Sequence, residues 1–146
     1  MDAIALKLCD IQGRLFELSA DKQYDSAVFI KNFMLSDTAK ALDSMYNRMQ
    51  WAGEEYLLEE VTSEAGCEIP KTGDLFSKEV LYWIGYLYRY WHYYTGESSK
   101  KIYQQAPVST MKRNYLMFHT MYPALAIDGL KEIYKAQARA LHIRSS

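Results

Sequence analysis

An aromatic segment at residues 81–94 constrains the fold more than any other part of the chain. It contains six of the thirteen tyrosines and two of the three tryptophans. In a helix, at 100° per residue, these side chains fall on two opposite sides. One side gathers the residues that we expect in the hydrophobic core, namely Val80, Trp83, Ile84, Leu87, Tyr90, Trp91 and Tyr94. Because such a helix has to be covered from several directions, the segment predicts the centre of a helical domain.

The opposite side of the same helix carries the residues that we predict to bind a partner: Tyr82, Tyr86, Arg89, His92 and Tyr93. All of them except His92 follow one another at spacings of four, three and four residues, which aligns them on one face. Tyrosine, tryptophan and arginine are enriched at the hot spots of protein interfaces. A second core face is the alternative interpretation, and a pocket for an anion or a nucleotide around Arg89 and His92 is another.

Hydrophobic periodicity predicts helices along the rest of the chain as well. Apolar residues recur at three and four over residues 2 to about 20, with Asp2 as the N-cap. Further helices are predicted after Asp25 and Ser36, over residues 54–65, and after Ser98, Ser109 and Pro123. Strand signals are almost absent. The sequence therefore predicts one all-α domain over residues 1–146, a compact irregular bundle of about six to eight helices around the aromatic helix at about 77–95.

Length and composition exclude several classes of protein. A chain of 146 residues is long enough to bury the core of a single domain. No run of eighteen apolar residues occurs, so we expect no membrane span. The first residues lack the features of a signal peptide, and we expect a cytoplasmic protein. Cys9 and Cys67 stand alone without clustered histidines, so we expect neither a metal site nor a cofactor.

Charge is distributed unevenly along the chain. Acidic residues predominate between residues 54 and 79, where Lys71 and Lys78 are the only basic ones, and basic residues predominate from Ser98 onward. This polarity favours a protein partner or a homodimer, whereas general nucleic-acid binding requires a strong basic excess. Solvated helix faces that differ in sign are the alternative interpretation.

The segment RNYLMFH at residues 113–119 carries the strongest enzymatic hypothesis. It fits the spacing of Arg, a following polar residue and His in metal-independent ribonucleases of the HEPN type, with Arg113, Asn114 and His119 as catalytic residues. The arginine would stabilise a charged phosphorane while the histidine moves a proton. The alternative is an exposed arginine and a half-buried histidine near a helix end, because so short a pattern also arises by chance.

Three strings carry a resemblance to a known family: YNRMQWAGEEY at 46–56, YWIGYLYRYW at 82–91 and YLMFHT at 115–120. They resemble a family of small helical bacterial proteins of the Firmicutes, and the resemblance extends over residues 27 to about 133. The genes of this family lie in short clusters similar to toxin–antitoxin modules, beside a gene for an ADP-ribosyltransferase-like protein. The resemblance implies an antitoxin or accessory protein and supplies no catalytic residue.

Together these patterns predict a non-enzymatic interaction protein that binds and occludes a partner, with an ADP-ribosyltransferase-like toxin as the implied partner. A HEPN-like endoribonuclease that pairs Arg113 and His119 in a dimer cleft is the alternative. Sequence-specific DNA binding through the helices at 98–120 ranks last, because Tyr115, Met117 and Phe118 suit a recognition helix poorly.

Overall fold

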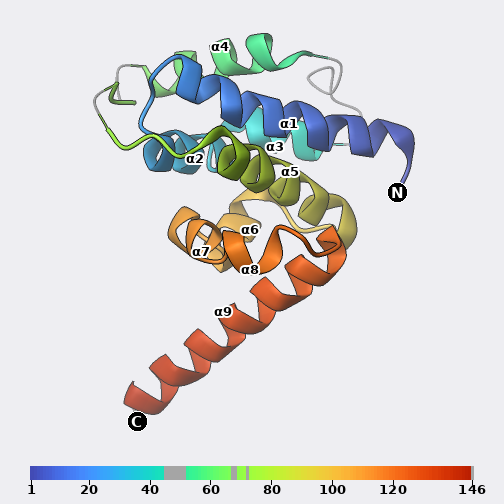
Figure 1. Ribbon diagram of the computed structural model, residues 1–146, viewed down its shortest axis with the longest axis vertical. Helices are drawn as coiled ribbons and strands as arrows, with labels where there is room; N and C mark the ends of the chain where they lie inside the picture. The colour runs from blue at the N-terminus through green and yellow to red at the C-terminus, as the bar shows by residue number, and fades with distance from the viewer. Residues whose placement is uncertain (45–51, 67–68, 72, 146) are drawn as a thin grey trace.

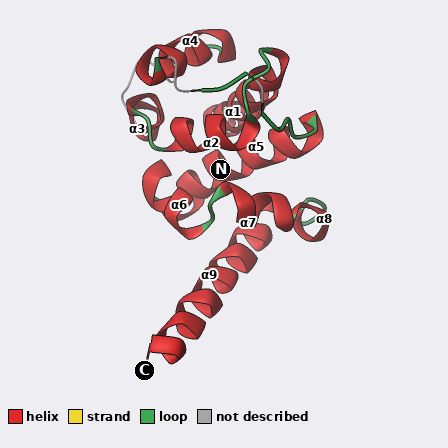
Figure 2. Cartoon of the chain, turned by 90° about the vertical axis from the view of Figure 1, so that its left-hand side faces the viewer, coloured by secondary structure: helices red, strands yellow, loops and turns green. Residues whose placement is uncertain are grey.

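The structure is a computed structural model that describes residues 1–44, 52–66, 69–71 and 73–145. These residues form nine helices and no strand, so the predicted all-α class is confirmed (Figures 1 and 2). The helices are α1 (Ala3–Asp21), α2 (Ser26–Met34), α3 (Asp37–Asp43), α4 (Glu54–Ala65), α5 (Lys78–Thr95), α6 (Ser99–Gln105), α7 (Val108–Arg113), α8 (Tyr115–Phe118) and α9 (Pro123–Ser145). Within this described part, no helix is both long enough and apolar enough to cross a membrane.

Most helices begin where the capping residues predict. The side chains of Asp2, Asp25, Ser36, Ser77 and Ser98 each accept a hydrogen bond from the backbone N–H three residues later. Helix α9 begins at Pro123, since proline is tolerated at the first helical position. The C-terminus of α5 is closed by a left-handed glycine at position 96, with φ of 78°.

The single helix predicted after Ser109 is wrong: α7 and α8 divide this segment. The backbone bends at Asn114, whose side-chain Nδ2 donates to the Thr110 carbonyl oxygen at 2.8 Å. Asparagine competes in this way with regular backbone pairing and favours a helix end. The division raises the helix count above the predicted six to eight.

Helices α1 and α5 form the centre of the fold and pack closely side by side (Figure 1). Gly13 and Gly85 stand at their contact. A β-carbon added to Gly85 would lie 2.5 Å from the backbone oxygen of Gln12, so this approach requires glycine. The Gln12 side chain also donates to the Gly85 carbonyl oxygen at 3.0 Å. Gly13, which weakens α1 as an isolated helix, thus makes room for the central packing.

The core face predicted for α5 is confirmed in its middle and wrong at its end. Ile84, Leu87 and Trp91 are buried, while the three expected core residues Val80, Trp83 and Tyr90 are half-buried and pack against the core. Tyr94 is 45% exposed. At this last turn of α5 its hydroxyl reaches Asp128 of α9 at the surface. Leu81 and Tyr88 are also buried, because helices cover α5 on more than one side.

Helix α9 starts against the body and then leaves it. Its first turns bury Ala126, Ile127 and Leu130, whereas residues 134–143 are exposed. Figures 1 and 2 show the helix pointing away from the other helices. The start of α9 therefore belongs to the core, and its second half extends beyond it.

Candidate functional site

Arg89, expected on the partner-binding face, lies inside the protein with 1% of its surface exposed. Its Nε donates to Gln12 Oε1 at 2.8 Å, Nη1 to Asp43 Oδ1 at 2.7 Å, and Nη2 to Ser99 Oγ at 3.2 Å. All three guanidinium nitrogens thus have partners on three other parts of the fold. The expectation of an exposed Arg89 is wrong, because α1, α3 and the start of α6 cover this turn of α5.

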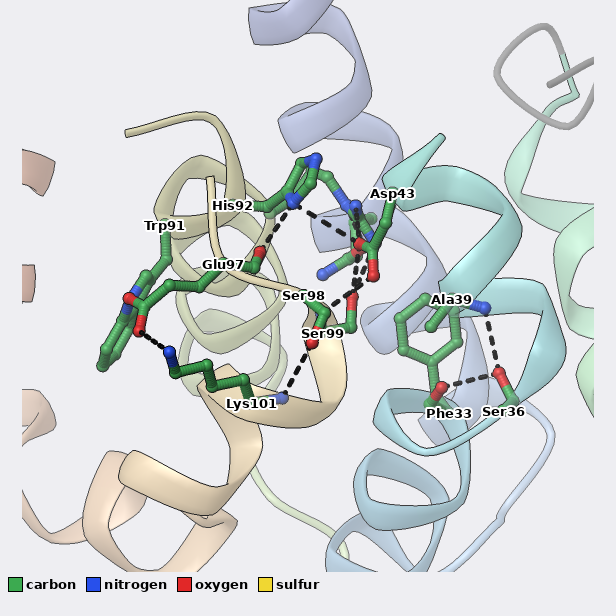
Figure 3. Close-up of polar contacts among 12 residues, drawn as sticks. Phe33, Ser36, Ala39, Asp43, Trp91, His92, Glu97, Ser98, Ser99 and Lys101 are labelled. Atoms are coloured by element: carbon green, nitrogen blue, oxygen red, sulfur yellow. Dashed lines mark hydrogen bonds and ion pairs between the residues drawn. The ribbon is translucent and has the colours of Figure 1, made fainter. Parts of the chain in front are cut away.

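Asp43 is the counter-charge of Arg89 and also anchors α6. It accepts hydrogen bonds from the Ser99 backbone N–H and hydroxyl, both at 2.8 Å (Figure 3). His92 lies beside this pair with its Nδ1 2.7 Å from the Glu97 carbonyl oxygen. A carbonyl only accepts, so Nδ1 carries the proton. We therefore assign a structural role to this cluster: it joins α3, α5 and α6.

Glu97 forms a second polar centre between α5, α6 and α9. Figure 3 shows its carboxylate between Trp91 and Lys101. Its carboxylate accepts from Trp91 Nε1 at 2.9 Å, Lys131 Nζ at 2.7 Å and Gln105 Nε2 at 2.8 Å. Burial raises the pKa of this carboxyl, but these hydrogen bonds outweigh it and lower the pKa to about 2. The ionised Glu97 therefore ties the start of α9 to the body.

Tyr93 is half-buried, and its hydroxyl oxygen is buried without a hydrogen-bond partner among the described residues. It lies beside Arg89 and Gln12, next to a gap too small for a water molecule. Burial raises the pKa of the phenol. Tyr93 and Arg89 thus belong to the packed part of the predicted partner-binding face.

Tyr86 and Tyr82, about one and two turns before Arg89 on α5, line an open groove of about 610 Å³. We call it the aromatic groove. Its walls come from α1, α5, α8 and the segment that leads into α9, and its lining residues are Glu17, Lys78, Glu79, Tyr82, Trp83, Tyr86, Leu87, Tyr115, His119, Met121 and Pro123. The predicted partner-binding face therefore divides into an open half, which lines this groove, and a covered half around Arg89.

The aromatic walls of the groove are held in place by ring and hydroxyl contacts. Trp83 stacks on Tyr115 with ring centroids 5.6 Å apart and planes 12° apart. The rings of Tyr82 and Tyr86 lie 5.9 Å apart. The Tyr82 hydroxyl donates to Asp10 Oδ1 at 2.5 Å, and burial together with this carboxylate raises its pKa. These contacts fix the groove before any partner binds.

His119 is exposed at the edge of the groove. Its Nδ1 lies 2.8 Å from the Tyr115 carbonyl oxygen and donates this hydrogen bond, because a carbonyl oxygen only accepts. Of the three residues in the ribonuclease hypothesis, only His119 lines the groove. Arg113 is exposed at the end of α7, and the Asn114 amide is bonded to its own helix. The groove thus offers a histidine without the arginine that would stabilise a phosphorane.

Large apolar side chains are exposed next to the groove, and we call this surface the apolar rim. It consists of Leu116, Met117, Met121, Tyr122 and Leu125. Leu116 is 87% exposed and Tyr122 80%. Met121 belongs to both sets, and every other rim residue lies within two residues of a lining residue along the chain.

Sequence reasoning missed part of this site. It assigned Trp83 to the core and did not place Glu17 or Tyr115 near α5. No local pattern links these residues, because the groove joins segments far apart in the chain. Across the described ranges, no three His, Cys, Asp or Glu side chains lie together in a way that could hold a metal ion.

A scan against models of protein families, a search of curated proteins and a search of solved structures each found no match.

Proposed function

We propose that the protein binds a partner protein through the aromatic groove and the apolar rim. In this proposal it is a cytoplasmic antitoxin-like or accessory protein of a bacterial toxin–antitoxin-type operon, and it acts by occluding its partner. The partner is an ADP-ribosyltransferase-like toxin, the class implied by the family that the strings at 46–56, 82–91 and 115–120 resemble. The observation that supports the proposal is an aromatic groove whose lining residue Met121 is also one of several large apolar side chains exposed in the same part of the chain.

The apolar rim supports a protein partner because adjacent exposed apolar side chains mark interaction surfaces. Single exposed apolar residues need no explanation, but here Leu116, Met117 and Tyr122 lie within seven residues of one another, all largely exposed. Methionine and tyrosine are both enriched in interfaces. A partner that covers the rim would remove this area from water.

The groove supports an anchored interface. Interfaces gain most of their energy from a few side chains that enter well-packed pockets. The groove has about 610 Å³ of space and walls of tyrosine and tryptophan. Because ring stacking between Trp83 and Tyr115 already orders these walls, little further entropy is lost when an anchor enters.

Co-expression with the product of the neighbouring gene tests the proposal, followed by affinity purification and a growth-rescue assay. Tyr86→Ala and Tyr122→Ala are expected to weaken the complex at least tenfold, roughly the effect of removing an interface hot spot. Tyr56→Ala on α4 is the matched control, because Tyr56 is exposed and lines no part of the groove. Circular dichroism checks that each variant is folded.

Two results contradict the proposal. In the first, the neighbouring protein does not co-purify with the wild type. In the second, Tyr86→Ala and Tyr122→Ala bind and rescue growth as well as Tyr56→Ala does. Sedimentation velocity on the free protein measures whether the homodimer predicted from the charge distribution forms.

A further inference from the structure

We infer that the aromatic groove receives a basic side chain, arginine or lysine, from an otherwise apolar segment of the partner. The inference deepens the proposed function and rests on it, since it specifies the chemistry of a protein partner. Three properties of the groove support it: two carboxylates without an ion pair of their own, tyrosine and tryptophan faces, and a lining lysine that is already paired with Asp21.

Glu17 and Glu79 supply the carboxylates. Both line the groove, and neither has an ion pair within the described part of the structure. Lys78 is the only lysine or arginine of the lining, and its Nζ is 2.6 Å from Asp21 Oδ1. The lining therefore presents two carboxylates against one lysine, and that lysine is already paired with Asp21.

The charged residues around Glu17 act on it in opposite directions: Lys78 and Arg14 favour its ionised form, and Asp10 and Asp21 disfavour it. Asp10 and Arg14 pair with each other at 3.0 Å just outside the groove. Glu17 is half-buried on α1, and burial raises its pKa against the opposing effect of Lys78 and Arg14. A cation placed in the groove would stabilise this partly desolvated carboxylate.

The rings define the rest of the occupant. A guanidinium or ammonium group is attracted to the faces of tryptophan and tyrosine within about 6 Å of the ring centroid. Arginine and lysine also carry an apolar stem that covers hydrophobic surface while the charged end reaches a polar group. Trp83, Tyr86 and Leu87 suit the stem, and Glu17 and Glu79 suit the charged end.

Other occupants fit less well. An acidic side chain would face Glu17 and Glu79, and the one lysine of the lining is already paired with Asp21. A purely apolar segment would desolvate the same carboxylates without compensation, which is costly. The apolar rim around the groove accounts for the apolar flanks of the segment.

Two probe peptides test the inference: acetyl-Leu-Arg-Leu-amide and acetyl-Leu-citrulline-Leu-amide. Citrulline keeps the shape of arginine without its charge. Binding is followed by NMR, from the shifts of the Trp83 indole and Tyr86 ring signals. The arginine peptide is expected to bind about tenfold more tightly than the citrulline peptide, and this preference is expected to fall with rising salt.

Variants connect the preference to the two carboxylates. In Glu17→Gln and Glu79→Gln the arginine preference is expected to shrink several-fold, whereas in Glu59→Gln, an exposed carboxylate on α4, it is expected to persist. Equal binding of both peptides, or binding of neither, overturns the inference. Co-purification with the neighbouring protein that depends on Tyr86 and Tyr122 would leave the proposed function standing in either case.

Discussion

Replacing Asp43 by alanine tests whether the buried Arg89 cluster stabilises the fold as its geometry indicates. Asp43 is the only carboxylate in contact with Arg89 among the described residues, at 2.7 Å. The exposed fractions of the two side chains are 1% for Arg89 and 12% for Asp43. Without Asp43 the guanidinium stays covered by α1 and α6 with no counter-charge. The backbone N–H of Ser99 loses its acceptor at the same time.

The expected loss follows from these contacts. Removal of one partner from a buried ion pair costs about 3–5 kcal/mol. Gln12 and Ser99 still accept hydrogen bonds from Arg89, and solvent reaches part of the Asp43 site. Both facts favour the lower end of this range. The free energy of unfolding is therefore expected to fall by about 3 kcal/mol. A single domain is stable by only about 5–15 kcal/mol, so the effect is large.

Urea unfolding of four proteins measures this: wild type, Asp43→Ala, Arg89→Met and the double variant. Replacing both partners by apolar residues removes the unpaired charge, so the double variant is expected to recover at least about 1 kcal/mol relative to the sum of the single losses. Glu132→Ala is the control, because its pair with Lys135 is largely exposed and is expected to contribute less than about 0.5 kcal/mol.

Two outcomes would refute the reasoning about Arg89. One is a loss below about 1 kcal/mol in Asp43→Ala, comparable to an exposed ion pair. The other is strict additivity of the two single losses in the double variant, because then Arg89 and Asp43 would not depend on each other.

Two further predictions concern stability. Gly85→Ala places a methyl group 2.5 Å from the backbone oxygen of Gln12 and is expected to lower stability by about 1–3 kcal/mol in thermal unfolding, whereas Gly53→Ala, with open space around it, should cost less than about 1 kcal/mol. Glu97 has a lowered pKa in the folded protein, so its contribution is present above pH 4.5 and is lost as the pH falls toward about 2. The stability advantage of the wild type over Glu97→Gln, measured by urea unfolding from pH 7 to 3, is therefore expected to shrink with falling pH. An advantage that stays constant would contradict the assignment.

The helical class and most helix boundaries were predictable from the sequence. The cap hydrogen bonds of Asp2, Asp25 and Ser36 span three residues, so the information that places them is local. The turn at Asn114 is local as well, since its amide bonds to Thr110, yet the helix predicted after Ser109 ran through it. The correctly predicted caps and the missed turn all depend on contacts between residues three or four positions apart.

The aromatic groove was predictable only in part. Tyr82 and Tyr86 were correctly placed on one face of α5 together, because a helical repeat determines which residues share a face. That they line an open groove depends on α8 and the start of α9, which bring Tyr115 to Trp83. Repeat patterns carry no information about such distant neighbours.

Arg89 marks the boundary between what the sequence and the tertiary structure each decide. Its place on the same face as Tyr82 and Tyr86 follows from spacing alone. Its partners Gln12, Asp43 and Ser99 are separated from it by 77, 46 and 10 residues. Periodicity determines that a face exists, but the packing of α1, α3 and α6 covers one half of that face and leaves the other half open, because burial depends on which distant segments lie opposite.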